Sequence, residues 1–112
     1  MQEDFLKIID DAHALNSKLF SLIRLELIAN LAIFGEDGIT YRELKSALGL
    51  NDGVLYSNLQ ALQGMGYVSV SMIKYENKEL QLWKITPDGL NEWKNVKRWL
   101  CMFLKCEVEL NG

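Results

Sequence analysis

The spacing of apolar residues changes abruptly at Gly66, and this change constrains the fold more than any other feature of the chain. Upstream, apolar residues recur at the three- and four-residue spacing of amphipathic helices. Downstream, YVSVSMI alternates as a half-buried strand does, with Val68, Val70 and Met72 on one side. KYENKE then reads as a polar turn and LQLWKI as a second strand. Helices therefore lead directly into a β-hairpin over residues 67–86.

Two helices are predicted before the first turn signal. The first, over residues 1–16, carries a single apolar stripe made of Phe5, Ile8, Ile9, Ala12 and Leu15. The second follows Ser17, a suitable N-cap, and is apolar on more than one face, so we expect it to be central. GEDG, at residues 35–38, ends it.

A short helix is predicted next, starting from the capping-box pattern TYRE. In this pattern Thr40 and Glu43 each satisfy a backbone group near the other residue. Leu44 and Leu48 would then face inward, and Gly49 stops the helix.

Asn51 is a suitable N-cap for a further helix, which runs to about Met65. Three leucines spaced at i, i+4 and i+7 form its buried stripe: Leu55, Leu59 and Leu62. Gly66 closes the helix before the hairpin, and Thr86 with Pro87 begins a long final helix after it.

This order predicts one mainly helical domain over residues 1–112, with a small β-hairpin. Two helices joined by a tight turn and followed at once by a hairpin form a winged helix-turn-helix. The predicted parts are an N-terminal helix (1–16), a helical core with the helix-turn-helix (17–66), the wing (67–86) and a C-terminal helix (87–112).

The helix after Asn51 would be the recognition helix, which enters the major groove of DNA in such folds. Its outward row contains small and uncharged side chains, Gly53, Tyr56, Ser57 and Gln60. A merely solvated face usually carries lysine and glutamate, so this row favours contact with DNA over simple exposure.

The stretch LGLNDGVLYSNLQALQGMGYV resembles the core pattern of prokaryotic winged-helix transcriptional regulators related to the MarR and ArsR groups. The matching residues are Leu50, Asp52, Gly53, Leu55, Leu59, Leu62, Gly66, Tyr67 and Val68. IRLELIANL at 23–31 and KITPDGL at 84–90 extend the resemblance in order. It implies a dimeric repressor or activator on a pseudo-palindromic operator, with the wing crossing the DNA backbone.

The resemblance also implies roles for individual residues of the recognition helix. Asp52, Gly53, Tyr56 and Ser57 stand where such regulators face DNA. The chain departs from the family in having Ser57 where a basic residue is frequent, and a wing with little arginine. It also has Asn58 where histidine is frequent, and we expect this residue to point inward as a hydrogen-bonded amide.

Phosphate contacts and base contacts are predicted to fall on different elements. Phosphates would be held from the preceding helix and from the wing, while Gln60 and Ser57 read bases and Tyr56 packs or uses its hydroxyl. The full predicted DNA-binding set is Arg42, Lys45, Asp52, Gly53, Tyr56, Ser57, Gln60, Lys74 and Lys78.

The terminal helices are predicted to form a homodimer, because WLCMFL is apolar all round and one domain buries only one face of a terminal helix. The predicted interface is Phe5, Ile8, Ile9, Trp93, Leu100, Phe103 and Leu104. The alternative is an intramolecular pair of these helices that caps the core.

The net charge of −3 does not exclude nucleic acid as a partner, because the acidity lies mainly in one segment. Residues 1–16 hold four acidic residues and one lysine, whereas residues 37–85 hold five of each sign. Without a secretory signal or an apolar run long enough to span a bilayer, we expect a cytoplasmic protein. Cys101 and Cys106 would then be buried reduced thiols.

No catalytic constellation is found in the sequence. His13 lies beside acidic residues on a predicted helix, which is typical of a surface histidine, and two cysteines with one histidine fall short of a zinc site. We therefore expect no enzyme activity, metal or cofactor, and the sequence identifies no effector. The competing function is a winged-helix module that docks a protein instead of DNA.

Overall fold

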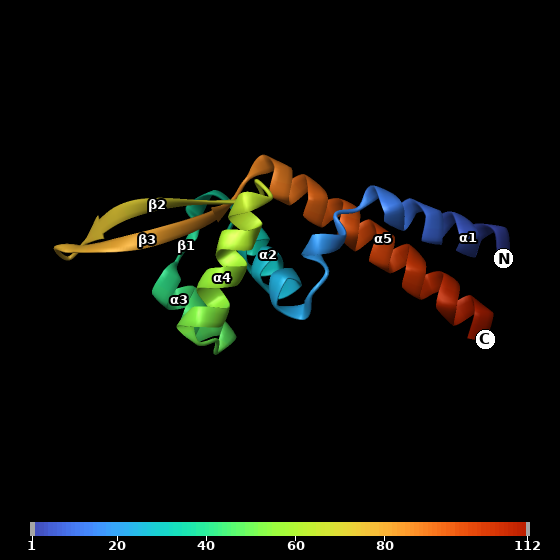
Figure 1. The fold of residues 1–112 in the computed structure, drawn as a ribbon, viewed down its shortest axis with the longest axis horizontal. Coiled ribbons are helices and arrows are strands. Elements are labelled where there is room, and N and C mark those ends of the chain that lie inside the picture. The colour runs from blue at the N-terminus through green and yellow to red at the C-terminus, as the bar shows by residue number, and fades with distance from the viewer. Residues whose placement is uncertain (1, 112) are drawn as a thin grey trace.

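The predicted helices and strands occur in the predicted order (Figure 1), and the described residues add one strand, β1, and three short 3₁₀ helices, η1, η2 and η3. The computed structural model describes residues 2–111, with side chains from residue 3 to residue 105. The elements are α1 (Gln2–Asp11), η1 (Ala12–Ala14), η2 (Ser17–Leu19), α2 (Leu22–Phe34), η3 (Gly35–Asp37), β1 (Ile39–Thr40), α3 (Tyr41–Leu48), α4 (Asp52–Gly64), β2 (Val68–Tyr75), β3 (Lys78–Ile85) and α5 (Pro87–Asn111). Among the described residues, no helix is both long and apolar enough to cross a membrane.

The core lies between α2, α4 and the base of the sheet. The predicted stripe of α4 is confirmed, since Leu55, Leu59 and Leu62 are all completely buried. They belong to one cluster with residues of α2, the wing and α5: Leu27, Ile28, Leu31, Val68, Trp83 and Val96. The central position predicted for α2 is confirmed by three of these side chains.

The start of α2 differs from the prediction. Ser21, not Ser17, caps this helix, and its hydroxyl accepts a hydrogen bond from the backbone N–H of Arg24 at 3.1 Å. Ser17 instead begins the short helix η2, which Asn16 caps by accepting from the backbone N–H of Lys18 at 3.0 Å. Asn16 and Ser21 therefore both cap helices in the short segment between α1 and α2.

The caps predicted around the helix-turn-helix are largely confirmed. The Thr40 hydroxyl accepts from the backbone N–H of Glu43 at 3.2 Å, and Asn51 accepts from that of Val54 at 2.9 Å. The Glu43 carboxylate accepts from the Thr40 hydroxyl at 2.7 Å, so this capping box closes through side chains. Gly49 ends α3 in the left-handed conformation, with φ of 63°.

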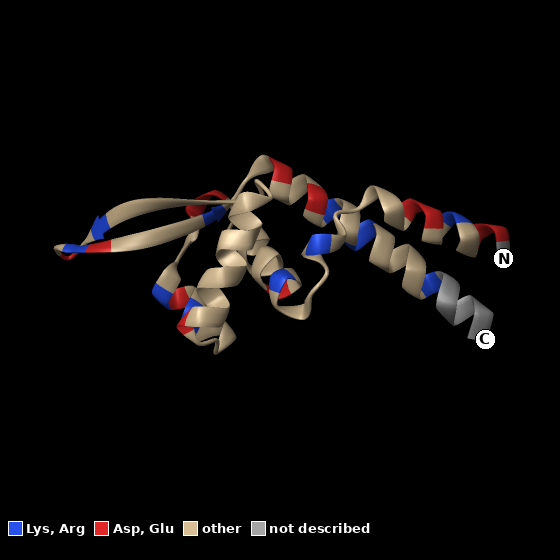
Figure 2. Cartoon of the chain, in the orientation of Figure 1, with Lys and Arg blue, Asp and Glu red and all other residues tan. Residues whose placement is uncertain are grey.

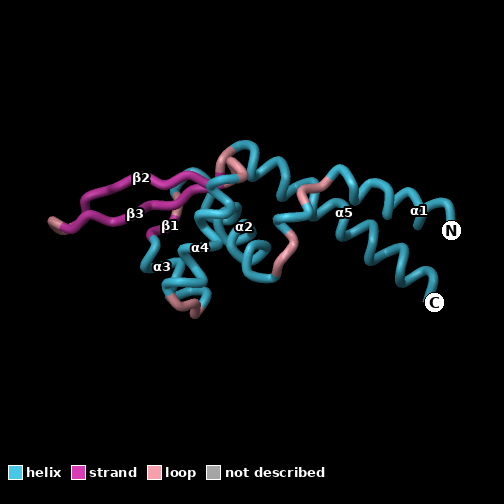
Figure 3. Tube along the Cα trace, viewed as in Figure 1, coloured by secondary structure: helices cyan, strands magenta, loops and turns pink. Residues whose placement is uncertain are grey.

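The wing is part of a three-stranded antiparallel sheet in the order β1-β3-β2 (Figure 3). The sequence did not predict β1, whose residues Ile39 and Thr40 pair with Trp83 and Leu82. The hairpin turn is tighter than predicted, because β2 continues to Tyr75 and β3 already begins at Lys78. Its two central residues both have positive φ, the conformation that matches the twist of a hairpin.

One apolar assignment in the wing is wrong. Val68 is buried as predicted, but Met72 is 57% exposed because the hairpin projects past the core (Figure 1). Towards the tip, apolar side chains shift to the opposite face, where Ile73, Leu80 and Leu82 line a groove of about 490 Å³ against β1 and α3. Alternation of apolar residues alone does not show where a strand leaves its core.

The terminal helices pair within the chain and form an arm that extends away from the wing (Figure 1). The Trp99 indole donates to the carbonyl oxygen of Ile8 at 2.7 Å, and the rings of Phe5 and Phe103 lie 6.3 Å apart. The two terminal helices are therefore observed to pair within the chain, as in the alternative, but they do so as an arm. The arm gives the molecule its length, with extents of 59 × 25 × 22 Å.

This pairing leaves several large apolar side chains of the arm exposed. They are Leu6 (65%), Ile9 (40%), Met102 (45%) and Leu104 (57%). Cys101 is exposed, which corrects the prediction of a buried thiol, and the side chain of Cys106 lies outside the described residues.

The junction between wing and arm is closely packed. As predicted, Thr86 caps α5, and its hydroxyl accepts from the backbone N–H of Gly89 at 3.0 Å. The same hydroxyl donates to the carbonyl oxygen of Gly66 at 2.6 Å. A Cβ atom on Gly89 would lie 2.1 Å from the Tyr67 carbonyl oxygen, so only glycine fits here.

Candidate nucleic-acid interface

The outward row of α4 is exposed at all four predicted positions. All four residues are exposed, on the side of α4 away from the three buried leucines: Gly53, Tyr56, Ser57 and Gln60. The Ser57 hydroxyl donates to the carbonyl oxygen of Val54 at 3.3 Å and keeps its oxygen lone pairs for a ligand. Hydrogen-bonding groups without formal charge thus cover the face of this helix.

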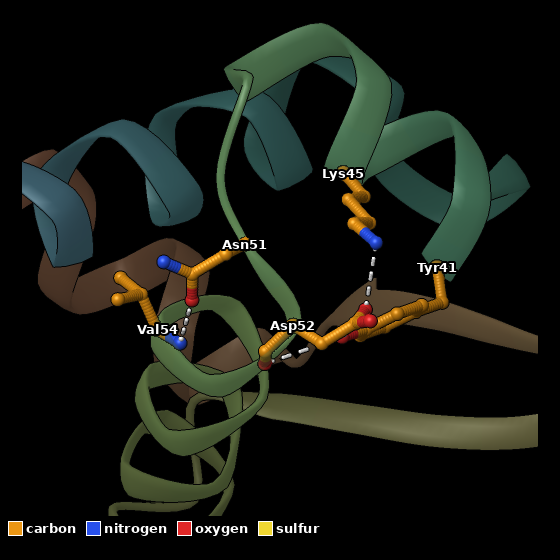
Figure 4. Close-up of polar contacts among 5 residues, drawn as sticks. All are labelled: Tyr41, Lys45, Asn51, Asp52 and Val54. Carbon is orange, nitrogen blue, oxygen red and sulfur yellow. Dashed lines mark hydrogen bonds and ion pairs between the residues drawn. The ribbon is translucent and has the colours of Figure 1, made fainter.

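Two predicted DNA contacts, Lys45 and Asp52, are instead brought together at the N-terminus of α4 (Figure 4). The Lys45 ammonium lies 3.0 Å from the Asp52 carboxylate, and the Tyr41 hydroxyl donates to the same oxygen, also at 3.0 Å. These bonds, chiefly that from Lys45, hold the pKa of Asp52 below its ordinary value. The pair leaves little net charge at this end of the helix.

Tyr41 links this pair to the outward row. Its ring meets that of Tyr56 edge to face, with centroids 6.4 Å apart. Loss of solvent, followed by the hydrogen bond to Asp52, raises the pKa of the Tyr41 hydroxyl. A protonated Tyr41 therefore supports Tyr56 from the side of α3.

The remaining predicted cations lie around α4 rather than on it (Figure 2). Arg42 is exposed on α3, and Lys74 and Lys78 are exposed near the tip of the wing. Glu79 is the antiparallel partner of Lys74 in the register of the hairpin. The wing tip therefore carries both positive and negative charges, and the positive potential that it offers to a phosphate is weak.

Arg24 is a residue that the sequence analysis did not single out. Its Nε donates to Oδ1 of Asn58 at 3.0 Å, and its Nη1 donates to the carbonyl oxygen of Lys18 at 2.7 Å. The predicted hydrogen-bonded amide at Asn58 is confirmed by this contact. The available signal was that Arg24 is the one basic residue in a mainly apolar helix.

Neither His13 nor any acidic cluster forms a metal site among the described side chains, where no three potential ligands converge. His13 is exposed, as predicted for a surface histidine. Tyr41 is the other functional candidate missed from sequence, because its partner Asp52 is distant along the chain and no local pattern marks it.

The helix-turn-helix of α3 and α4, followed directly by the wing, defines a winged-helix protein. The family described as "Winged helix DNA-binding domain" matches residues 23–104, and the chain belongs to this family. No curated protein sequence matches the chain.

Solved structures share this fold over nearly the whole chain. The transcriptional regulator homologue protein from Pyrococcus horikoshii OT3 is 21% identical, with 98% of this chain and 99% of that chain covered and a TM-score of 0.70. A transcription regulator from Bacillus cereus ATCC 10987, described as MarR-like, is 23% identical, with coverages of 93% and 68% and a TM-score of 0.63. MepR of S. aureus in its DNA complex is 11% identical, with coverages of 98% and 86% and a TM-score of 0.65. The family match confirms the predicted winged-helix family, and the similar structures confirm that the chain shares the fold of MarR-like regulators.

Proposed function

We propose that the chain is a DNA-binding transcriptional regulator that places α4 in the major groove and its wing on the phosphate backbone. The observation that carries this proposal is the uncharged, exposed row on α4 between cations of α3 and of the wing. Family membership supports it, as do similar folds solved in DNA complexes, including FabT of Streptococcus pneumoniae.

Contacts would be divided between the elements. Arg42, Lys74 and Lys78 hold phosphates, which fixes position without reading sequence. Gln60 suits adenine, and Ser57 suits either kind of base. Lys45 contributes less than predicted, because Asp52 already neutralises it. We therefore expect modest affinity with a moderate dependence on salt.

Two-fold symmetry would come from the arm. Its exposed apolar side chains, which include Leu6 and Leu104, are candidates for contact with a second copy. A symmetric dimer would present two α4 helices to the halves of a pseudo-palindromic site. We place this regulator in the cytoplasm and propose neither a cofactor nor an enzyme activity for it.

A salt titration of DNA binding tests the proposal, once a preferred sequence has been selected from random DNA. Replacing Lys74 and Lys78 by alanine should weaken all sequences alike and flatten the dependence on salt. Gln60→Ala should change the preference at one base pair, by about 1–3 kcal/mol. Arg98→Ala, at an exposed position of α5, is the control and should change neither quantity.

The second candidate function is docking of a protein partner. The groove beside the wing favours it, because Ile73, Leu80 and Leu82 give it an apolar lining close to α3. Protein docking through this groove would be insensitive to salt. If the wing and Gln60 variants bind DNA as the parent does, protein docking should replace the DNA proposal.

A further inference from the structure

Arg24 joins three segments of the chain through its hydrogen bonds. Its side chain donates to Asn58 in α4 at 3.0 Å and to the carbonyl oxygen of Lys18 in η2 at 2.7 Å. Its backbone N–H donates to the Ser21 hydroxyl that caps α2. One residue therefore connects the recognition helix, the central helix and the segment that arrives from the arm.

The amide of Asn58 is held at both ends. Its oxygen accepts from Arg24, and its nitrogen donates to the carbonyl oxygen of Val54 at 2.8 Å, one turn earlier in α4. Asn58 lies between exposed Ser57 and buried Leu59, at the edge of the buried face. Any rotation of α4 about its own axis would therefore stretch the bond to Arg24.

The segment on the other side of Arg24 is anchored in turn. The backbone N–H of Asn16 donates to the Glu92 carboxylate of α5 at 2.8 Å. The Asn16 amide nitrogen donates at 3.2 Å to the hydroxyl of Tyr67, the residue before β2. Hydrogen bonds thus lead from the base of the arm, through residues 16–24, to the middle of the recognition helix.

We propose that Arg24 is a positioning residue that sets the rotation of α4 relative to the arm. It acts through Asn58, and it determines where the uncharged outward row of α4 points. This inference rests on the proposed function, because the position of that row has consequences only when it reads DNA. A direct contact of the Arg24 charge with a phosphate would be a different role, and the experiment below separates the two.

Arginine meets this geometry because its planar guanidinium offers several donors in a fixed fork. Its positive charge also strengthens the bonds to both neutral acceptors. Lysine keeps the charge but has a single ammonium on a flexible stem, so Arg24→Lys removes the fork and retains the charge. Arg24→Gln removes the charge, and Asn58→Leu removes the acceptor in α4.

The test combines hydrogen exchange in the free protein with DNA binding. In Arg24→Lys and in Asn58→Leu, backbone amides of α4 should exchange about tenfold faster or more, as expected when charge-assisted bonds are lost. The preferred site should bind about tenfold more weakly than in the parent, while scrambled DNA binds as before. The double variant should be no worse than either single variant, because both remove one interaction. Arg98→Lys on α5 is the matched control and should change none of these quantities.

Two results would overturn the proposal. Exchange in α4 that stays at the parent rate in both variants would show that the bond does not hold the helix. The exchange measurement does not involve DNA, so this result overturns the proposal whether or not the parent prefers any DNA sequence. A parent without any preference among DNA sequences would separately reject the proposed function. Alternatively, if Arg24→Gln weakens specific and scrambled DNA equally and lowers the salt slope by about one, Arg24 contacts a phosphate instead.

Discussion

The ammonium group of Lys45 lies 3.0 Å from the carboxylate of Asp52, at the point where α4 begins. Both residues were predicted to contact DNA, yet each is satisfied by the other, with Tyr41 as a third member. A carboxylate that is 70% exposed at this position also repels approaching phosphates. We therefore expect the pair to restrain the DNA affinity of α4, which carries no other formal charge.

Asp52→Asn should tighten binding to all DNA sequences. The substitution frees Lys45 for a phosphate and removes a negative charge, so the salt slope should steepen by about one. Fluorescence anisotropy over a range of salt concentrations measures both effects. Asp88→Asn removes the same charge from the first turn of α5 and should leave binding nearly unchanged. A loss of affinity confined to the preferred site would show instead that Asp52 reads a base.

The same pair should be visible in a pH titration of the free protein. Since the folded pKa of Asp52 is lowered, its contribution to stability is present above the unfolded pKa. That contribution is lost as the pH falls through the lowered folded pKa. A carboxyl-carbon NMR titration should place the Asp52 pKa below the ordinary value for an aspartate, and Lys45→Met should raise it. An unchanged Asp52 titration in Lys45→Met would contradict the pairing in solution.

Gly53→Ala tests whether the backbone of α4 comes close to DNA. A Cβ atom here would meet only the Asn51 side chain, at 3.6 Å, so the fold should accept it or gain up to about 1 kcal/mol. DNA affinity should nevertheless fall, because the added methyl group faces the groove. Gly64→Ala, at the other end of α4 with open space around it, is the control and should bind as the parent does. Equal affinity of both variants would argue against close approach.

Dimerisation through the arm should be tested by substituting exposed residues of the arm. Truncating the chain after Lys94 is a poorer test, because it would also remove the fully buried Val96. Replacing Leu6 and Leu104 by glutamate should convert a dimer into a monomer without unfolding it. Ile33→Glu, at a side chain that is 81% exposed on α2, is the matched control for a new charge on an apolar surface. Sedimentation velocity at micromolar concentration gives the result, and a monomeric parent would reject the dimer outright.

Leu59→Ala and Gln60→Ala, adjacent substitutions on opposite faces of α4, compare its interior with its surface. Leu59→Ala should lower the free energy of unfolding by about 2–5 kcal/mol, because it opens a cavity in the core. Gln60→Ala should change it by less than about 0.5 kcal/mol, since the side chain is exposed. Denaturant unfolding measures both, and similar losses would contradict the assignment of faces.

Features set by neighbouring residues were predictable from the sequence. Asn51 and Thr86 cap helices at the expected positions, because capping depends on a side chain and the backbone within one turn. Strand β1 was not predicted, since Ile39 pairs with Trp83, far along the chain, and two residues carry no periodicity.

The contacts of the candidate site were harder to predict for the same reason. The row on α4 follows from helical spacing, but Arg24 and Asn58 meet only because the core sets α2 against α4. From the sequence, Lys45 was likewise predicted to contact DNA with an unpaired charge. Only the packing of α3 against the start of α4 shows that Asp52 neutralises it.

The turn at the wing tip has a consequence for kinetics. Glu76 and Asn77 have φ of 51° and 63°, and glutamate suits this left-handed region poorly, at a cost of roughly 1 kcal/mol. The Glu76 side chain also places a carboxylate between Lys74 and Lys78, next to the DNA phosphates that these lysines would hold. Glu76→Asn would therefore make the hairpin more stable and the complex longer-lived, since changes at an interface act mainly on dissociation. We therefore expect the present tip to shorten the residence time of the proposed regulator on DNA, and a short residence time would let occupancy follow a changing signal quickly.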